Sequence, residues 1–91
     1  MNTNAIIADQ KDSVVTLTKF LRKDSFAEYE LNGEIKKVQA KEDIPEYHKI
    51  AVADVKKGEA VIKYGEIIGY AKEDIYAGEY VHIHNMSSDG R

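Results

Sequence analysis

The chain has 91 residues, enough for one small domain, and a formal net charge of −3 from 13 basic and 16 acidic side chains. Because neither sign dominates, the basic surface that nucleic-acid binding needs is missing. No apolar stretch approaches the ~20 residues of a membrane span, and the N-terminus lacks the features of a secretory signal, so we expect a cytoplasmic protein without membrane or nucleic-acid partners. Without cysteine, no disulfide or thiolate metal site can stabilise the domain, which makes a partner subunit the expected source of extra stability.

The first half of the chain reads as a series of short strands. Apolar and β-branched runs predict strands at residues 5–8, 13–18, 26–31 and 34–40. Asn32-Gly33 predicts a two-residue hairpin turn between the last two strands, because both positions tolerate a positive φ. For residues 19–30 a helical period is the alternative, and we favour a turn at residues 22–25 instead.

The second half contains a repeated unit, Asp-(Val/Ile)-x-x-Gly-Glu-x-Val, at Asp54–Val61 and again at Asp74–Val81. We expect each aspartate to accept backbone N–H bonds in the turn that follows it, and each glutamate to serve the same turn. Gly58 and Gly78 are expected to supply the positive φ of that turn. The repeat therefore predicts two similar strand–turn–strand pieces.

Two weaker copies extend this pattern toward the N-terminus. Phe20-x-x-Lys23-Asp24-x-Phe26 has the spacing of Val55-x-x-Gly58-Glu59-x-Val61, and Asp43-Ile44 precedes a turn and a strand at residues 47–52. A hairpin over residues 63–71 turns at Gly65, with Tyr64 expected in the core, and residues 86–91 read as a polar, disordered tail. Many short strands with a turn every 8–12 residues predict an all-β barrel or clip over residues 1–85.

Two of the three histidines, His82 and His84, directly follow the second copy of the repeat. In a strand, residues i and i+2 face the same side, so the two imidazoles could converge on one metal ion or one substrate. A pKa near neutral also suits a histidine to proton transfer. The alternative is that both are polar strand-end residues, one bonded to a backbone carbonyl and one contacting a partner subunit. The first copy has Ile62 and Tyr64 at these positions, and this difference within the repeat favours a function for the pair.

The stretch from His48 to Asn85 resembles the SAF domain of the altronate/galactarate dehydratase family. The shared pattern is His-Lys-Ile-Ala, the first repeat unit with Lys-Tyr-Gly, then Ile-Gly-x-Ala, and the second repeat unit with His-Ile-His-Asn. It covers 38 of the 91 residues, and several separate pieces occur in the family's order. The segment Asp12–Val15 resembles the family more weakly. The resemblance implies a small β-clip fold with at most short helical turns.

The resemblance also implies a hydro-lyase of sugar-acid metabolism, acting on acids such as altronate or galactarate with a divalent metal, Fe²⁺ or similar, shared with a partner subunit. The small subunit of sulfolactate sulfo-lyase is a related protein. The chain is then expected to be a small subunit, or an N-terminal SAF domain, that is inactive without a large catalytic subunit and that could also form a homo-oligomer. The alternative is a non-catalytic SAF-like module that binds a sugar acid or a partner protein.

β-Elimination of water needs a base for the proton next to the carboxylate, a cation for the enediolate, and an acid for the departing hydroxyl. The candidates for catalysis, and tentatively for metal binding, are His82 and His84. The candidates for substrate binding are His48, Lys49, Lys63 and Asn85. Three of these have a structural alternative, because His48 can be a packing residue, Lys49 an exposed strand lysine and Asn85 a turn residue. Asp12 is expected to serve a turn rather than a metal.

Overall fold

The computed structural model describes residues 3–88, and these residues form strands and turns but no helix. The all-β class is therefore confirmed, and no helix in the described range is available to cross a membrane. The described strands are β1 (Ala5–Ile6), β2 (Val14–Leu17), β3 (Phe26–Leu31), β4 (Glu34–Gln39), β5 (Lys49–Ala51), β6 (Ala60–Lys63), β7 (Glu66–Ala71), β8 (Tyr80–Val81) and β9 (Met86–Ser87).

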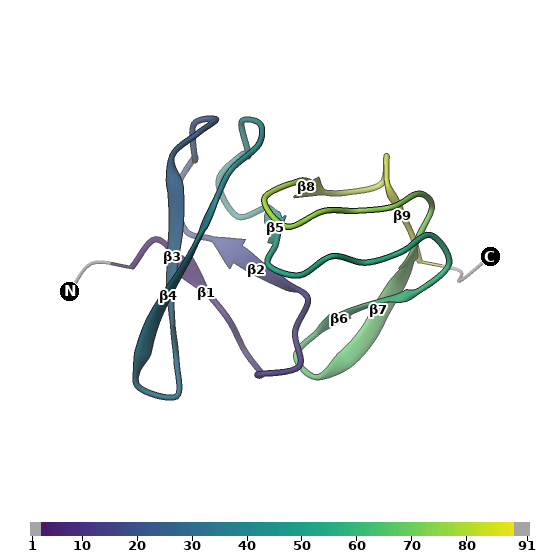
Figure 1. The fold of residues 1–91 in the computed structure, drawn as a ribbon, viewed down its shortest axis with the longest axis horizontal. Coiled ribbons are helices and arrows are strands. Elements are labelled where there is room, and N and C mark those ends of the chain that lie inside the picture. The colour runs from purple at the N-terminus through teal and green to yellow at the C-terminus, as the bar shows by residue number, and fades with distance from the viewer. Residues whose placement is uncertain (1–2, 89–91) are drawn as a thin grey trace.

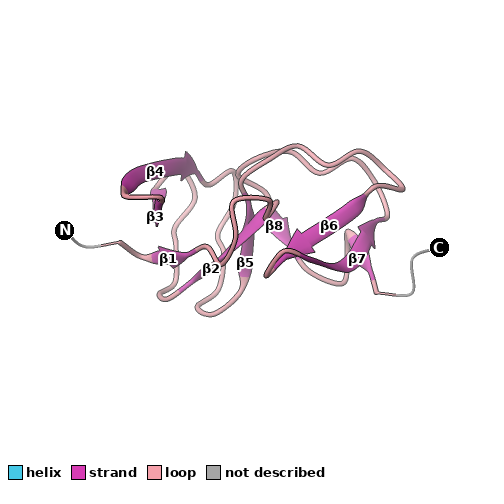
Figure 2. Cartoon of the chain, turned by 90° about the horizontal axis from the view of Figure 1, so that it is seen from below, coloured by secondary structure: helices cyan, strands magenta, loops and turns pink. Residues whose placement is uncertain are grey.

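The strands form three antiparallel sheets, arranged one after another along the domain (Figure 1). A central four-stranded sheet has the order β1-β2-β5-β8, the β3–β4 hairpin lies at one end, and the sheet β6-β7-β9 lies at the other. Figure 2, turned by 90°, shows the same succession with long loops joining the short strands. The Asn32-Gly33 turn joins β3 and β4 as predicted, with φ values of 53° and 81°.

The central sheet has a hydrophobic core on each face, because alternate residues of a strand point to opposite sides. Val15, Leu17 and Ile50 pack with residues of the β3–β4 end, including Ala27 and Tyr29. A second core lies on the other face, where the buried residues are Val14, Ala51, Val55, Val61, Ala71, Ile75 and Val81. The short β5 thus separates two small cores.

The two clear copies of the repeat pair with each other across a pseudo-symmetric contact. Val55 and Ile75 exchange backbone N–H···O bonds of 2.8 and 2.7 Å, and the two loops run alongside each other in Figure 1. The Asp54 carboxylate accepts the Ala77 N–H, and the Asp74 carboxylate accepts the N–H of residue 57, both at 2.9 Å. The expectation that each aspartate serves its own turn is wrong: each one holds the turn of the other copy.

The glutamates of the repeat do serve their own turns, as predicted. Glu59 Oε1 accepts the Lys56 N–H at 2.9 Å, and Glu79 Oε1 accepts the Tyr76 N–H at 3.0 Å. The glycine before each glutamate has a positive φ, 87° and 97° respectively. A carboxylate that closes a tight turn removes an unpaired backbone donor, so the repeated glutamates are structural.

The first half of the chain contains the two weaker copies, but one of them is aligned one residue away from the predicted register. Leu21 bridges Ile44 as Val55 bridges Ile75, and Asp43 accepts the Lys23 N–H at 2.7 Å. Leu21 is buried, whereas Phe20 is 56% exposed, so Leu21 rather than Phe20 takes the buried position of the repeat. Asp24, three residues after Leu21, then adopts the positive φ that glycine adopts in the later copies.

Three further expectations about the second half are corrected. The strand β8 ends at Val81, and residues 82–85 form a turn. Met86–Ser87 is not a tail but the strand β9, which pairs with β7, so the domain continues past residue 85; residues 89–91 lie outside the described range. Tyr64 is not in the core: it occupies the β6–β7 turn with φ 59° and is 66% exposed.

Candidate functional site

All three histidines of the chain gather around Tyr80. The strands β5 and β8 are antiparallel, with Lys49 opposite Val81 and Ile50 opposite Tyr80. The next pair outward in this register is His48 and His82, whose ring centroids lie 5.0 Å apart. Pairing of β5 with β8 therefore brings His48 next to the His-x-His motif, which begins 34 residues later in the chain.

Tyr80 lies at the centre of this group, which we call the histidine cluster (His48, Tyr80, His82 and His84). The Tyr80 hydroxyl and His48 Nδ1 share a hydrogen bond of 2.6 Å. The ring of His82 stacks on Tyr80 at 5.6 Å with an interplanar angle of 11°, and the ring of His84 lies 5.4 Å from Tyr80. A phenol bonded to an imidazole, with a second imidazole stacked beside it, is an arrangement that can hold and move a proton.

The turn at residues 82–85, not a strand, positions the last two histidines. Asn85 is buried, its Oδ1 accepts the His82 N–H at 3.0 Å, and its Nδ2 donates to the Tyr80 carbonyl at 2.8 Å. The Lys72 ammonium donates to the Ile83 carbonyl at 3.0 Å and ties the turn to the β7 end. Of the two alternatives for Asn85, the structure supports the turn residue, since its amide is used within the fold.

The surroundings of His82 favour its neutral form. Desolvation lowers its pKa below the ordinary value of 6.5, and the nearby His48, Lys49 and His84 lower it further. The neutral imidazole is therefore favoured near pH 7, which leaves a ring nitrogen able to accept a proton.

The two candidate lysines lie near each other rather than within the cluster. Lys49 is directly opposite Thr16 of β2, and strand alternation places its side chain on the face of β5 opposite to that of His48. Burial lowers the pKa of Lys49, and the positive charge of Lys63 lowers it further. Lys63 itself ends β6, with its ammonium 4.6 Å from the centre of the Tyr64 ring. Apart from Asn85, the substrate-binding candidates thus divide into His48 in the cluster and a lysine pair outside it.

The described part of this chain contains no complete ligand set for the expected metal. Within residues 3–88, no group of three or more His, Cys, Asp or Glu side chains is arranged to hold a metal ion. His82 and His84 alone would leave most ligand positions of a divalent metal to another chain. Asp12 has the predicted turn role, because its carboxylate accepts the N–H groups of Ala8, Asp9 and Gly65.

Sequence reasoning missed Tyr80 and Thr16. Tyr80 precedes His82 by two residues, so strand alternation already placed both on one face, and this signal was available. Thr16 gave no such signal, because a threonine in a β-branched run is typical of an ordinary strand.

The fold and this site define a small all-β domain whose catalytic candidates lie at the ends of its central strands. The family model for the altronate/galactarate dehydratase SAF domain matches residues 3–89, and the chain belongs to this family. The resemblance inferred from residues 48–85 is therefore confirmed, and it extends over nearly the whole chain.

Individual relatives share a shorter segment. The chain is 40% identical over 52 residues to altronate dehydratase of Bacillus subtilis and 48% identical over 52 residues to altronate dehydratase of Escherichia coli, in each case 57% of this chain and 10% of the relative. It is also 47% identical over 52 residues to the (2R)-sulfolactate sulfo-lyase subunit alpha of Paracoccus pantotrophus, which is 57% of this chain and 78% of that subunit. The chain spans about a tenth of the two dehydratases and most of the sulfo-lyase subunit.

Proposed function

We propose that this chain is the SAF component, as a small subunit or an N-terminal domain, of a cytoplasmic lyase that eliminates a β-substituent from a small hydroxy acid. The observation that supports this proposal is the histidine cluster, in which His48, His82 and His84 surround Tyr80. The names of its relatives suggest the substrate class, an altronate- or galactarate-type sugar acid that loses water or a sulfolactate that loses sulfite.

Within this proposal, His82 is the base. Its pKa is lowered, so the neutral ring can remove the proton on the carbon next to the substrate carboxylate. The hydrogen-bonded pair of Tyr80 and His48 is the acid that protonates a departing hydroxyl, and the ring of His84, 5.4 Å from that of Tyr80, supports the pair. The electrons of the broken C–H bond form the double bond as the β-substituent leaves, and the resulting enol converts to a 2-keto acid.

The third requirement, a cation for the developing enediolate, is assigned to the large subunit. The described part of this chain has no three-ligand metal group, so a divalent metal would need ligands from that subunit as well as from His82 and His84. Ile83, 72% exposed between the two histidines, gives the cluster an apolar contact for that partner.

The first test is reconstitution. We expect the purified chain alone to have no lyase activity on altronate, galactarate or sulfolactate, and a co-purified large subunit to restore turnover. Full activity of the isolated chain would contradict the proposed division of the active site between two subunits.

The second test uses variants of the reconstituted complex. His82→Gln should lower kcat by about 10²-fold or more, as is typical of a lost general base, and Tyr80→Phe should lower it less. Tyr47→Phe, a tyrosine 71% exposed and outside the cluster, is the matched control. Unchanged turnover of His82→Gln in an intact complex would favour the alternative, a module that only binds an acid or a partner protein.

A further inference from the structure

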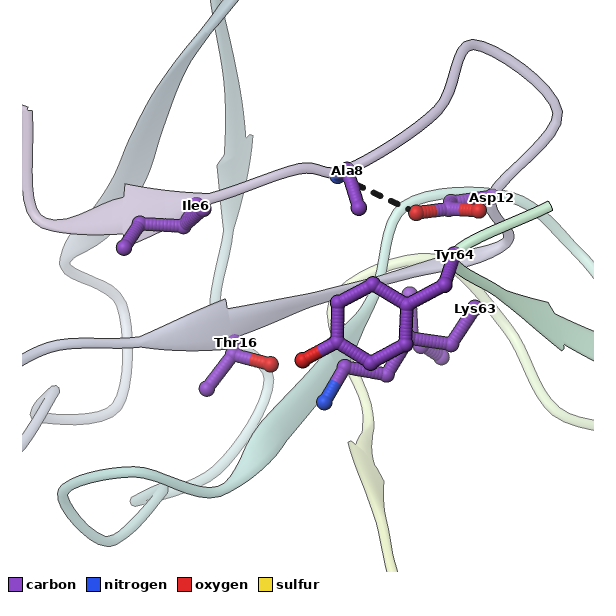
Figure 3. Close-up of a pocket in the computed structure, with 7 residues that line it drawn as sticks. Ile6, Ala8, Asp12, Thr16, Lys63 and Tyr64 are labelled. Atoms are coloured by element: carbon purple, nitrogen blue, oxygen red, sulfur yellow. Dashed lines mark hydrogen bonds between the residues drawn. The ribbon is translucent and has the colours of Figure 1, made fainter.

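A small pocket opens between β1, the start of β2 and the β6–β7 turn, on a different part of the domain from the histidine cluster. It has a volume of about 120 Å³ and is lined by Ile6, Ala8, Asp12, Val14, Thr16, Lys63 and Tyr64. In Figure 3 the Thr16 hydroxyl, the Tyr64 hydroxyl and the Lys63 ammonium are directed toward the same part of this pocket. Apart from the Asp12 carboxylate, these three polar groups lie on apolar walls, which is typical of a site for one small polar group.

The Thr16 hydroxyl lacks a partner within the described chain. Its oxygen is buried, and no group of residues 3–88 forms a hydrogen bond with it. A buried hydroxyl without a partner destabilises a fold, so native structures nearly always satisfy such groups. Since Thr16 lines a pocket and its hydroxyl is directed toward it in Figure 3, a bound ligand can satisfy it.

Positive charge near the pocket is not neutralised within the domain. Lys63 lines the pocket, and Lys49 lies directly opposite Thr16 across β2 and β5, so both side chains are on the same face of the sheet. Neither ammonium forms an ion pair with a carboxylate of residues 3–88. The Asp12 carboxylate does line the pocket, but three backbone N–H groups bind it and hold the β1–β2 loop against the β6–β7 turn.

We infer that this pocket is a binding site for the carboxylate group of a small hydroxy acid, held by Lys49 and Lys63 and by the hydroxyls of Thr16 and Tyr64. The pocket has room for several water molecules, which matches a carboxylate and its neighbouring hydroxyl rather than a whole sugar acid. The anion site stands on its own geometry, whereas its assignment to the substrate rests on the proposed function. In that assignment Lys49 joins the two regions, since it lies opposite Thr16 in the sheet and its charge helps to lower the pKa of His82.

The test is an NMR titration of the full chain with sodium glycerate, the smallest acid that has hydroxyls on both the α- and the β-carbon. Glycerol and sodium chloride, the latter at matched ionic strength, are the comparison ligands. We expect saturable shifts of the backbone amides of Thr16, Lys49, Lys63 and Tyr64 with glycerate and none with glycerol. Shifts that fail to saturate, or that chloride reproduces, would overturn the site.

Two variants make the test specific. Lys63→Gln should weaken glycerate binding by about tenfold or more, because a hydrogen bond to a charged group is lost, and Thr16→Val should weaken it less. Lys57→Gln is the matched control, since Lys57 is an exposed lysine in the turn of the repeat. Equal affinity of Lys63→Gln and the unchanged protein would overturn the inference.

The reconstituted enzyme separates this inference from the proposed function. Lys63→Gln should raise KM, whereas His82→Gln should lower kcat. Saturable glycerate binding without any lyase activity would refute the proposed function and leave the anion site standing. Activity that depends on His82, with no effect of Lys63→Gln on glycerate binding or KM, would refute the anion site alone.

Discussion

Replacing Thr16 by valine should stabilise the isolated domain. The Thr16 hydroxyl is buried without a partner in residues 3–88, and leaving such a group unpaired costs ~1–3 kcal/mol. Valine has nearly the same shape, keeps the branched Cβ that suits β2, and replaces the hydroxyl with a methyl group. We therefore expect the free energy of unfolding to rise by about 1–2 kcal/mol, which for a domain of this size raises Tm by about 4–8 °C per kcal/mol.

The assay is thermal and urea unfolding followed by circular dichroism, in a chloride buffer without carboxylates or phosphate, since an anion that binds the native state would stabilise it. Ser13→Ala provides a control of opposite sign. The Ser13 hydroxyl accepts the Ile62 N–H at 2.8 Å, so its loss leaves a backbone donor unpaired and should cost about 1–2 kcal/mol. Thr18→Val, outside the pocket, should change stability by less than ~0.5 kcal/mol.

A Thr16→Val protein that is no more stable than the original would refute this reasoning, because it would show that the Thr16 hydroxyl forms a hydrogen bond in the folded domain. The substitution should also affect ligand binding. The same substitution that stabilises the domain should weaken glycerate binding, as is common where a binding site leaves polar groups unpaired until the ligand arrives.

The remaining predictions concern the repeat and the cluster. Gly78→Ala should be far more damaging than Gly58→Ala, although both glycines have positive φ. An added Cβ at Gly78 would clash with the backbone oxygen of Gln39. At Gly58 no described atom lies within 4 Å of the added Cβ, so only the ~1–2 kcal/mol of backbone strain applies. Equal losses in urea unfolding would contradict this. Asp54→Ala should cost about 0.5–1.5 kcal/mol and speed hydrogen exchange of the Ala77 amide in the other copy; unchanged exchange would refute the crossed contact. Because folding lowers the pKa of His82 below 6.5, the unfolded chain binds a proton at this ring more tightly than the folded chain does. The free energy of unfolding should therefore fall as the pH drops from 6.5 toward the folded pKa, and His82→Gln should flatten this part of the pH–stability curve. A slope that survives the substitution would assign it to another group.

The candidate site was only partly readable from the sequence. His82 and His84 were found because the second copy of the repeat differs there from the first, but their contact with Tyr80 comes from a turn that Asn85 holds, not from a strand. His48 joined them only through the pairing of β5 with β8, a contact between segments more than 30 residues apart. Local patterns do not fix such a register, because it depends on which strands meet in the folded sheet.

What the sequence by itself determined is the local framework of the domain: the strand β3, the Asn32-Gly33 hairpin, the positive φ of Gly58 and Gly78, and the glutamates that close their turns. These features follow from the properties of single residues and their neighbours in the chain. The tertiary structure alone decided which turn each repeat aspartate holds, that residues 86–87 add a strand to β7, and that Lys49, Lys63 and Thr16 lie near one pocket. The physical reason is that hydrogen bonds and charges act through space, and only folding brings these distant residues close enough to interact.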